Sequence, residues 1–180
     1  MRELYQLYSS ALNATQIDDI IQAALDQTAA DATIFSSAKA MSSIRNSTVR
    51  WVPDAWVGDL LWDYVKQANA DGFDVNVDNH AEIQFTEYHA AQGGHYDWHH
   101  DVHWNGQADF DRKISITVQL TDAGDYEGGD FEFDEVKTNA DFRSKGTVLV
   151  FPSYLRHRVS PVTSGIRRSL VAWFSGPRWK

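Results

Sequence analysis

Four histidines and two aspartates lie within ten residues of the sequence, in the segment HYDWHHDVHW at positions 95–104. Imidazole nitrogens and carboxylate oxygens are metal ligands. Alternate residues of a strand point to one side, which predicts a shared face for His95, Asp97, His99, Asp101 and His103. Neighbours on that face are roughly 6.7 Å apart and can reach one ion, whereas residues four apart cannot. The segment therefore predicts one adjacent ligand pair: His95/Asp97, Asp97/His99, His99/Asp101 or Asp101/His103.

A site built on such a pair needs a third ligand from elsewhere in the chain. The histidines outside the segment are His80, His89 and His157. Two histidines and one carboxylate on one octahedral face leave three positions open, which suits non-haem Fe(II) and its oxygen chemistry. The alternative interpretation is a solvated loop or a hydrogen-bonded cluster without metal. The segment by itself does not decide between the two.

Composition narrows the classes of protein to consider. The chain has 180 residues, a net charge of -9, a pI near 5.1 and no cysteine. An acidic chain is disfavoured as a nucleic-acid binder, because phosphates require clustered basic residues. Without cysteine there are no disulfides and no thiolate sites, so any metal has nitrogen and oxygen ligands. We find no signal peptide and no apolar stretch of about 20 residues, and therefore expect a cytoplasmic protein without membrane contact.

Two amphipathic helices are predicted in the first half of the chain. The first begins after Thr15, a typical N-cap residue, and has apolar residues at helical spacing. The second begins near Pro53 and ends at the Asn-Ala-Asp-Gly stretch of residues 69–72. Residues 32–51, between them, are rich in serine and alanine and then more strand-like from Ile44. We expect both helices to support a sheet.

From residue 81 onward the sequence predicts strands. The β-branched and aromatic runs are EIQFTEY, RKISITVQL, FEF, TVLVF, HRV and RSLVAWF, separated by Gly, Asp, Asn and Pro. Such spacing is typical of an antiparallel sandwich or barrel. We therefore expect a mainly β (α+β) fold in a single domain over residues 1–180, with about 1–80 as a helical support and lid region and about 81–176 as the β core.

One motif pattern is distributed over three blocks of the chain. They are YHAAQGGHYDWHHD, RKISITVQLTDAGDYEGGDFEF and KGTVLVFPSYLRHRVSPVTSGIRRSLVAW, and they cover most of residues 88–173. The pattern is a tyrosine three positions before H-x-D, a later histidine, and a basic residue ten positions further on, after P-V-x-x-G. It resembles the Fe(II)- and 2-oxoglutarate-dependent dioxygenases, within them the prolyl 4-hydroxylase-like group. The matching positions are Tyr96, His99, Asp101, His157, Pro161, Val162, Gly165 and Arg167.

The resemblance implies a double-stranded β-helix (jelly-roll) core and a division of roles among the site residues. It selects His99, Asp101 and His157 as metal ligands, with His95/Asp97 as the runner-up pair. It implies that the cosubstrate is bound by Arg167, Tyr88 and Ser169, and that the substrate side includes Tyr96, Arg112 and Trp173. Alternation along the last strand supports this, because Arg167, Ser169 and Trp173 share a face. The alternative interpretations are a surface salt bridge for Arg167 and plain core packing for Trp173.

The resemblance also implies the reaction and its cofactors. We expect a hydroxylase that uses Fe(II), 2-oxoglutarate, O2 and ascorbate, converts 2-oxoglutarate to succinate, and acts on proline in a peptide or protein. One alternative is a dioxygenase of the same superfamily that acts on a small molecule or another side chain. Another is a metal-binding jelly-roll module without catalysis. The oligomeric state is left open.

An acidic stretch interrupts the strand-like region. Residues 122–135 hold seven acids and no base. Such a stretch is usually a solvated edge, but it can also steer a basic peptide toward the protein.

Overall fold

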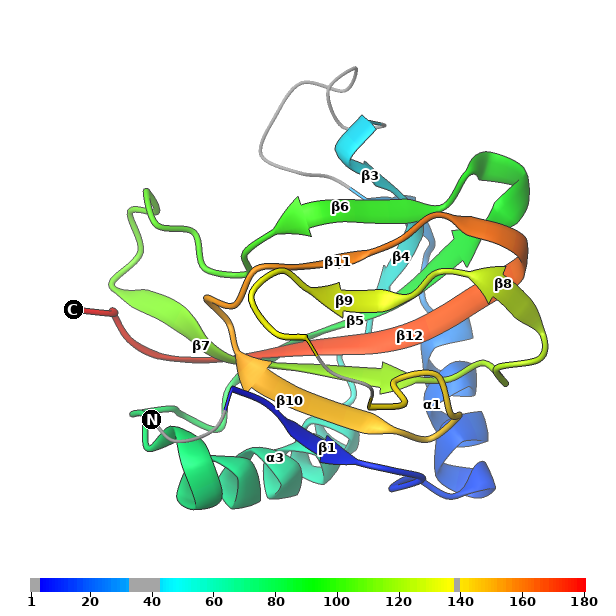
Figure 1. The fold of residues 1–180 in the computed structure, drawn as a ribbon. Helices are drawn as coiled ribbons and strands as arrows, with labels where there is room; N and C mark the ends of the chain where they lie inside the picture. Colours follow the sequence, from blue (N-terminus) through cyan, green and yellow to red (C-terminus); the bar gives the residue numbers. More distant parts are fainter. Residues whose placement is uncertain (1–3, 33–42, 138–139) are drawn as a thin grey trace.

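Two antiparallel sheets with helices on one side make up the computed structural model, which describes residues 4–32, 43–137 and 140–180 (Figure 1). The main sheet has the order β1-β10-β7-β12-β5-β4-β2, with β8 also paired to β12, and the minor sheet has the order β3-β6-β11-β9. This confirms the predicted mainly β class. Part of the expected lid, residues 33–42, lies outside the described residues. The elements are β1 (Gln6–Tyr8), α1 (Ala14–Leu25), β2 (Ala30–Asp31), β3 (Arg45–Asn46), β4 (Thr48–Trp51), α3 (Ala55–Ala68), a π-helical turn (Asn69–Phe73), β5 (Ala81–His89), a 3-10 turn (Ala90–Gln92), β6 (His95–His99), β7 (Phe110–Gln119), β8 (Tyr126–Gly128), β9 (Phe131–Phe133), β10 (Val148–Pro152), β11 (His157–Val159) and β12 (Val162–Pro177).

Both predicted helices are present and pack on the outer face of the main sheet. Helix α1 is capped by Asn13, whose side chain accepts the Gln16 N–H while Gln16 caps the Asn13 N–H in return. The N-cap expected at Thr15 is therefore wrong by two residues, because Asn13 forms the complete capping box. Within the described part of the chain, no helix is long and apolar enough to cross a membrane.

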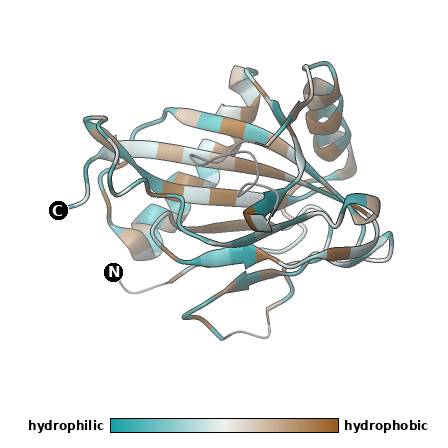
Figure 2. Cartoon of the chain, turned by 90° about the horizontal axis from the view of Figure 1, so that it is seen from above, coloured by the Kyte–Doolittle hydropathy of each residue, from teal (hydrophilic) through white to brown (hydrophobic). Residues whose placement is uncertain are grey.

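The strands of the main sheet separate apolar from polar residues. On β7, Ile114, Ile116 and Val118 pack against the helices in one buried cluster. The alternate residues Ser115, Thr117 and Gln119 are also buried but point to the other side, toward the minor sheet. The alternation is visible as bands of different hydropathy along the strands (Figure 2). The helix-facing row anchors the sheet, and the inward row forms a polar interior.

A second apolar cluster closes one part of the space between the sheets. Phe133, Leu149, Phe151 and Leu155 are buried there, and Phe131 packs beside them. Aromatic rings meet edge-on, as between Phe133 and Phe151 at 5.2 Å and 81°. This packing ties the minor sheet to β10 and leaves the remaining interior for the polar row.

The N-terminal region is less purely helical than its sequence predicts. Strand β1 pairs with β10 at the edge of the main sheet, and β2 and β4 continue that sheet beyond β5. β3 instead joins the minor sheet beside β6. These short strands, and β8, were missed or only suggested because two to four residues are too few to show a period.

An ion-pair network joins three neighbouring strands of the main sheet, β4, β5 and β12. Glu87 of β5 accepts hydrogen bonds from Arg50 of β4 at 2.5 Å and from Arg168 of β12 at 3.0 Å. Burial alone would raise the pKa of Glu87, but the two arginines outweigh burial and lower the pKa below its usual range. The ionised carboxylate therefore stabilises the folded state.

We predict that Glu87→Gln lowers the free energy of unfolding by about 1–3 kcal/mol at neutral pH, since two charge-assisted hydrogen bonds are lost. A carboxyl group with a lowered folded pKa stabilises above its unfolded pKa, near 4.3, and that stabilisation disappears as the pH falls through the folded pKa. Urea unfolding should show a larger difference at pH 7 than at pH 3. The exposed Glu127→Gln is the control, and an equal loss at both pH values for Glu87→Gln would contradict the assignment.

Candidate active site

Strand β6 brings Tyr96 and His99 to the same side of the minor sheet although they are three residues apart. His99 pairs with His157 of β11, while Tyr96 pairs with Val159, so the β6 side of the ladder has one extra residue. The two rings stack with centroids 3.4 Å apart and 9° between planes. The strict alternation predicted for residues 95–103 is therefore wrong, because a bulge shifts the parity and β6 ends at His99.

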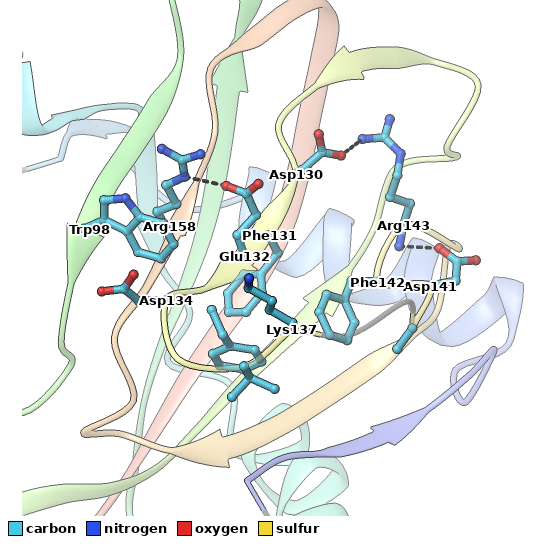
Figure 3. A pocket seen from close by; sticks show the side chains of 13 residues that line it. Trp98, Asp130, Phe131, Glu132, Asp134, Lys137, Asp141, Phe142, Arg143 and Arg158 are labelled. Carbon is cyan, nitrogen blue, oxygen red and sulfur yellow. Dashed lines mark hydrogen bonds and ion pairs between the residues drawn. The ribbon is translucent and has the colours of Figure 1, made fainter.

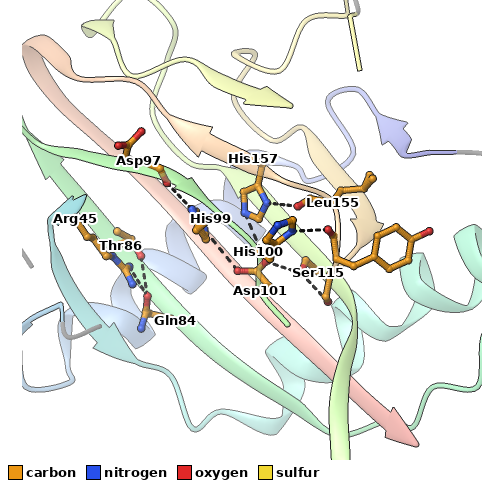
Figure 4. A network of polar contacts seen from close by, with 12 residues as sticks. Arg45, Gln84, Thr86, Asp97, His99, His100, Asp101, Ser115, Leu155 and His157 are labelled. Atoms are coloured by element: carbon orange, nitrogen blue, oxygen red, sulfur yellow. Dashed lines mark hydrogen bonds and ion pairs between the residues drawn. The ribbon is translucent and has the colours of Figure 1, made fainter. Parts of the chain in front are cut away.

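Three side chains from two distant segments converge beside this bulge (Figure 4). His99, Asp101 and His157 each offer a ligand atom, and these atoms all lie within 4.8 Å of one another. The Nε2 atoms of His99 and His157 are each 3.6 Å from an oxygen of Asp101. Two imidazoles and one carboxylate so arranged match the facial set of a non-haem Fe(II) site. Among the described residues no other such group is found.

The hydrogen bonds of the two histidines orient their rings for metal binding. His99 Nδ1 lies 2.7 Å from the Asp97 carbonyl oxygen, and His157 Nδ1 lies 2.9 Å from that of Leu155. A carbonyl only accepts, so each Nδ1 carries the proton and each Nε2 keeps its lone pair toward Asp101. The backbone thus selects the tautomer that a metal needs.

The electrostatics of the cluster also favour ligands in their binding states. Burial, assisted by His157, lowers the pKa of His99 to about 3, so its imidazole is neutral at physiological pH. Burial opposes charge on Asp101, but the two histidines and the Ser115 hydroxyl outweigh it and lower the pKa of this carboxyl group. Ser115 Oγ donates to Asp101 at 2.6 Å. A neutral imidazole and an ionised carboxylate are the forms in which His99 and Asp101 bind a divalent cation.

The runner-up pair His95/Asp97 does not converge with a third ligand. The ring nitrogens of His95 face the carbonyl oxygens of Gly93 and Ser43, and the Asp97 carboxylate accepts the N–H of Trp98. Both residues of this pair therefore serve the local backbone.

A narrow inner cavity between the sheets connects the candidate ligands with Arg167. Trp173 of β12 pairs with Ser115, which donates to Asp101, so Trp173 lies near the candidate metal ligands. Arg167 lies six residues earlier in the same strand. Arg167 is only 3% exposed, and its Nη1 donates to Ser169 Oγ at 3.3 Å. Its guanidinium carbon lies 5.6 Å from the centre of the Tyr88 ring, and no described carboxylate pairs with it. The predicted cosubstrate residues are thus brought together, and a surface salt bridge at Arg167 is ruled out.

Two glycines shape the backbone around this arginine. Gly165 has a φ of +71°, and a Cβ there would lie 2.1 Å from the Asp125 carbonyl oxygen. Gly129 has a φ of +64°, and a Cβ there would lie 3.0 Å from Cδ of Arg167. Both positions require glycine, since other residues rarely adopt this conformation and lack the space. The P-V-x-x-G motif therefore has a steric basis.

An outer cleft of about 430 Å³ opens beside the candidate ligands. Arg112 forms two contacts with Glu82, at 2.9 and 2.8 Å, and lies 3.9 Å above the Trp173 ring. Trp173 in turn packs against the half-exposed Trp51, with ring centroids 6.1 Å apart. Trp173 is buried but lines both the inner cavity and the outer cleft, so it is more than a core residue.

The sequence interpretation missed two residues that support the site, Ser115 and Gln84, and did not predict the burial of a third, Arg45. Ser115 donates a hydrogen bond to Asp101. The alternation of β7 was a signal from which the inward orientation of Ser115 could have been predicted. Arg45 of β3 and Gln84 of β5 are joined by a 2.7 Å hydrogen bond and line both the cavity and the cleft. Nothing in the short run around Arg45 predicts its burial.

The acidic side chains of residues 122–135 line neither the inner cavity nor the outer cleft, and most of them are paired. Four of these carboxylates meet cations from other segments, in the pairs Asp122–Lys145, Asp130–Arg143, Glu132–Arg158 and Asp134–Arg156. A hollow of about 670 Å³ on this surface is lined by acidic and basic side chains and by Trp98 and Phe142 (Figure 3). These pairs offset much of the charge that steering of a basic peptide would require.

Comparison with known families and structures agrees with this geometry. The family profile described as the 2OG-Fe(II) oxygenase superfamily matches residues 83–175. A PKHD-type hydroxylase of Synechococcus sp. (strain CC9311) is 42% identical over 83 residues, which are 44% of this chain and 36% of that protein. A second, from Idiomarina loihiensis, is 34% identical over 94 residues, which are 52% of this chain and 41% of that protein. The chain thus spans about two fifths of the length of these relatives.

Solved structures with the same fold extend over nearly the whole chain. A prolyl-4-hydroxylase of Pseudomonas putida superposes with a TM-score of 0.74 at 19% identity, covering 97% of this chain and 93% of that one. A viral collagen prolyl hydroxylase from Paramecium Bursaria Chlorella virus-1 gives 0.70 at 19% identity and covers 97% of both chains. At this identity the likeness establishes the jelly-roll fold, as predicted, including the N-terminal segments.

We predict that the protein binds one Co(II) ion at the cluster of His99, Asp101 and His157. His157→Ala should lower the affinity by more than the roughly 10–100-fold typical of losing a residue behind a ligand, and Ser115→Ala should fall within that range. His95→Ala is the matched control and should bind Co(II) like the unaltered protein. Titration followed by the visible spectrum of Co(II) measures all three, and loss of binding in His95→Ala alone would reassign the site.

Proposed function

Because the chain belongs to the 2OG-Fe(II) oxygenase superfamily, we propose that it is an Fe(II)- and 2-oxoglutarate-dependent prolyl 4-hydroxylase that acts on proline in a peptide or protein. One observation carries the proposal. Three ligand atoms within 4.8 Å of one another share a cavity with the buried guanidinium of Arg167, which pairs with no carboxylate of the residues that the structure describes. A metal ion and a dicarboxylic acid together satisfy both features.

The residues present fit both groups chemically. His99, Asp101 and His157 would hold the ferrous ion with neutral nitrogens and one carboxylate. Arg167 would bind the far carboxylate of 2-oxoglutarate with parallel N–H donors, and Ser169 would add a hydroxyl group. Tyr88 would bound the same end of the cavity. A buried guanidinium without a counter-ion is costly, so the arginine favours an anionic occupant.

When bound, iron and 2-oxoglutarate would supply activation of O2, insertion of one oxygen atom into a C–H bond, and release of succinate and CO2. Ascorbate as reductant is part of the proposal. The protein contributes a dry interior and fixed orientations. Tyr96 stacks on His99, and burial raises its pKa to about 12, so the phenol stays protonated beside the ligands.

Proline as the target is supported by the chemistry of the outer cleft. Trp51, Trp173 and Tyr96 present aromatic surface there, and such surface packs well on a pyrrolidine ring. The cleft is open and lies beside Asp101, so a segment of polypeptide has access to the ligands. The names of the structural neighbours, which are prolyl hydroxylases, point the same way. The lack of cysteine supports a reducing compartment, and we propose the cytoplasm.

We expect the protein supplied with Fe(II), ascorbate, O2 and 2-oxoglutarate to form succinate, and to add one oxygen atom to proline-containing peptides. The measurement is succinate release together with peptide mass spectrometry. His157→Ala, which lacks a ligand, is the inactive control. Metal binding without any succinate formation across a peptide library would instead favour the module without catalysis.

Arg167→Ala should weaken 2-oxoglutarate binding by at least about 10-fold, since a buried charge-assisted bidentate contact is lost, and should leave Co(II) binding intact. The matched control is Arg168→Ala, which removes the neighbouring guanidinium from the opposite face of β12. Calorimetric titration of 2-oxoglutarate into the Co(II)-loaded proteins measures this. An unchanged affinity in Arg167→Ala would refute the assignment of the cosubstrate cavity.

A further inference from the structure

Arg45 is a second buried arginine whose contacts are all neutral. It is 8% exposed, and its Nε donates to Ser47 Oγ at 3.0 Å while Nη2 donates to Gln84 Oε1 at 2.7 Å (Figure 4). Its guanidinium carbon lies 4.5 Å from the centre of the Tyr96 ring. These neutral groups fix the orientation of the guanidinium and leave its charge uncompensated.

The other arginines show how unusual this is. Six of the described arginines pair with a carboxylate, whereas the two most buried ones, Arg45 and Arg167, have no such partner among the described residues. Outside the described ranges the sequence contains a single acid, Glu3. Taking a guanidinium out of water without a counter-ion is costly, so a ligand that supplies negative charge is favoured at both positions.

The two arginines line different parts of the site. Arg167 lines the inner cavity, where a cosubstrate carboxylate would neutralise it. Arg45 lines the inner cavity and also the outer cleft, where the substrate would enter. Within the cleft, Arg112 is already neutralised by Glu82.

A charge balance over the filled site leaves Arg45 unmatched. A ferrous ion and Arg167 carry three positive charges, which Asp101 and the two carboxylates of 2-oxoglutarate cancel. The Arg112–Glu82 pair is neutral. The remaining positive charge is that of Arg45, so the filled site with an uncharged substrate would keep a buried cation.

We propose that Arg45 binds a carboxylate of the substrate, and hence that the protein hydroxylates substrates with a negative charge close to the target C–H bond. This inference rests on the proposed function and narrows it to one class of substrate. The carboxylate belongs either to an acidic side chain beside the target residue or to a free C-terminus. Both present the two oxygens that a guanidinium recognises.

The test compares peptides that differ only in charge. Acetylated, amidated pentapeptides with a central proline would carry Glu before the proline, Glu after it, or Gln at both places. A fourth peptide would end in proline with a free carboxylate, and a fifth in its amide. Binding to protein loaded with Mn(II) and 2-oxoglutarate is measured by calorimetry, so the readout does not depend on turnover.

We expect at least one carboxylate peptide to bind at least about 10-fold more tightly than its neutral counterpart, the range of a charge-assisted hydrogen bond. Arg45→Gln, which keeps a hydrogen-bond donor but no charge, should abolish that preference and leave 2-oxoglutarate affinity unchanged. Arg45→Lys should retain part of the preference. The exposed Arg178→Gln is the control for total charge and should behave like the unaltered protein.

Several outcomes overturn the inference. These are equal binding of charged and neutral peptides, or a preference that survives in Arg45→Gln. Loss of 2-oxoglutarate affinity in Arg45→Gln would assign this arginine to the cosubstrate instead. Failure of the proposed function is distinct, because the unaltered protein would then bind no 2-oxoglutarate, or would bind 2-oxoglutarate and none of the five peptides.

Discussion

The two-residue alternation of β7 and β12 is the constraint on which the rest of the structure depends. One row of side chains packs on the helices, so the opposite row must face the minor sheet and is equally buried. That inward row is polar, which costs stability unless each group finds a partner. Ser115 and Ser169 have partners in Asp101 and Arg167. Among the described residues, Gln119 Oε1, Thr147 Oγ1 and Trp173 Nε1 have none, and they lie along the cavities rather than in the apolar clusters. The polar interior therefore has the character of a binding site as well as of a core.

Charge is distributed in opposite ways outside and inside this frame. The chain is acidic overall, and on the outer face of the minor sheet carboxylates and guanidinium groups meet in pairs. Inside, the two buried arginines have no carboxylate partner in the described part of the chain, and the one buried carboxylate beside them faces two histidines. Exposed pairs contribute little stability, whereas an unpaired buried charge has a large effect on what binds. Net charge therefore describes the surface of this protein and says little about its ligands.

Much of this was predictable from sequence, for reasons that differ between parts. The long strands β5, β7 and β12 show their period over nine or more residues, so their facing rows, including Arg167 and Ser169, followed from alternation. The choice of His99 over His95 came from the resemblance, because local spacing allows both. What failed was local parity in β6, where a bulge places Tyr96 beside His99 and no period can reveal it. The burial of Arg45 was not predicted, because a two-residue strand carries no periodic signal and the burial depends on β5 and β6.

The candidate metal and cosubstrate residues lie in one part of the chain, and two residues that line the outer cleft lie in another. The candidate metal ligands and Arg167 lie within residues 83–175, which match the family profile. Arg45 and Trp51, which line the outer cleft, lie before that range and reach the site through the short strands β3 and β4. β3 is hydrogen-bonded to β6 beside the ligands, so an N-terminal side chain is held against a site built by the C-terminal half. Under the proposal for Arg45, substrate choice is governed by a segment outside the residues that match the family profile.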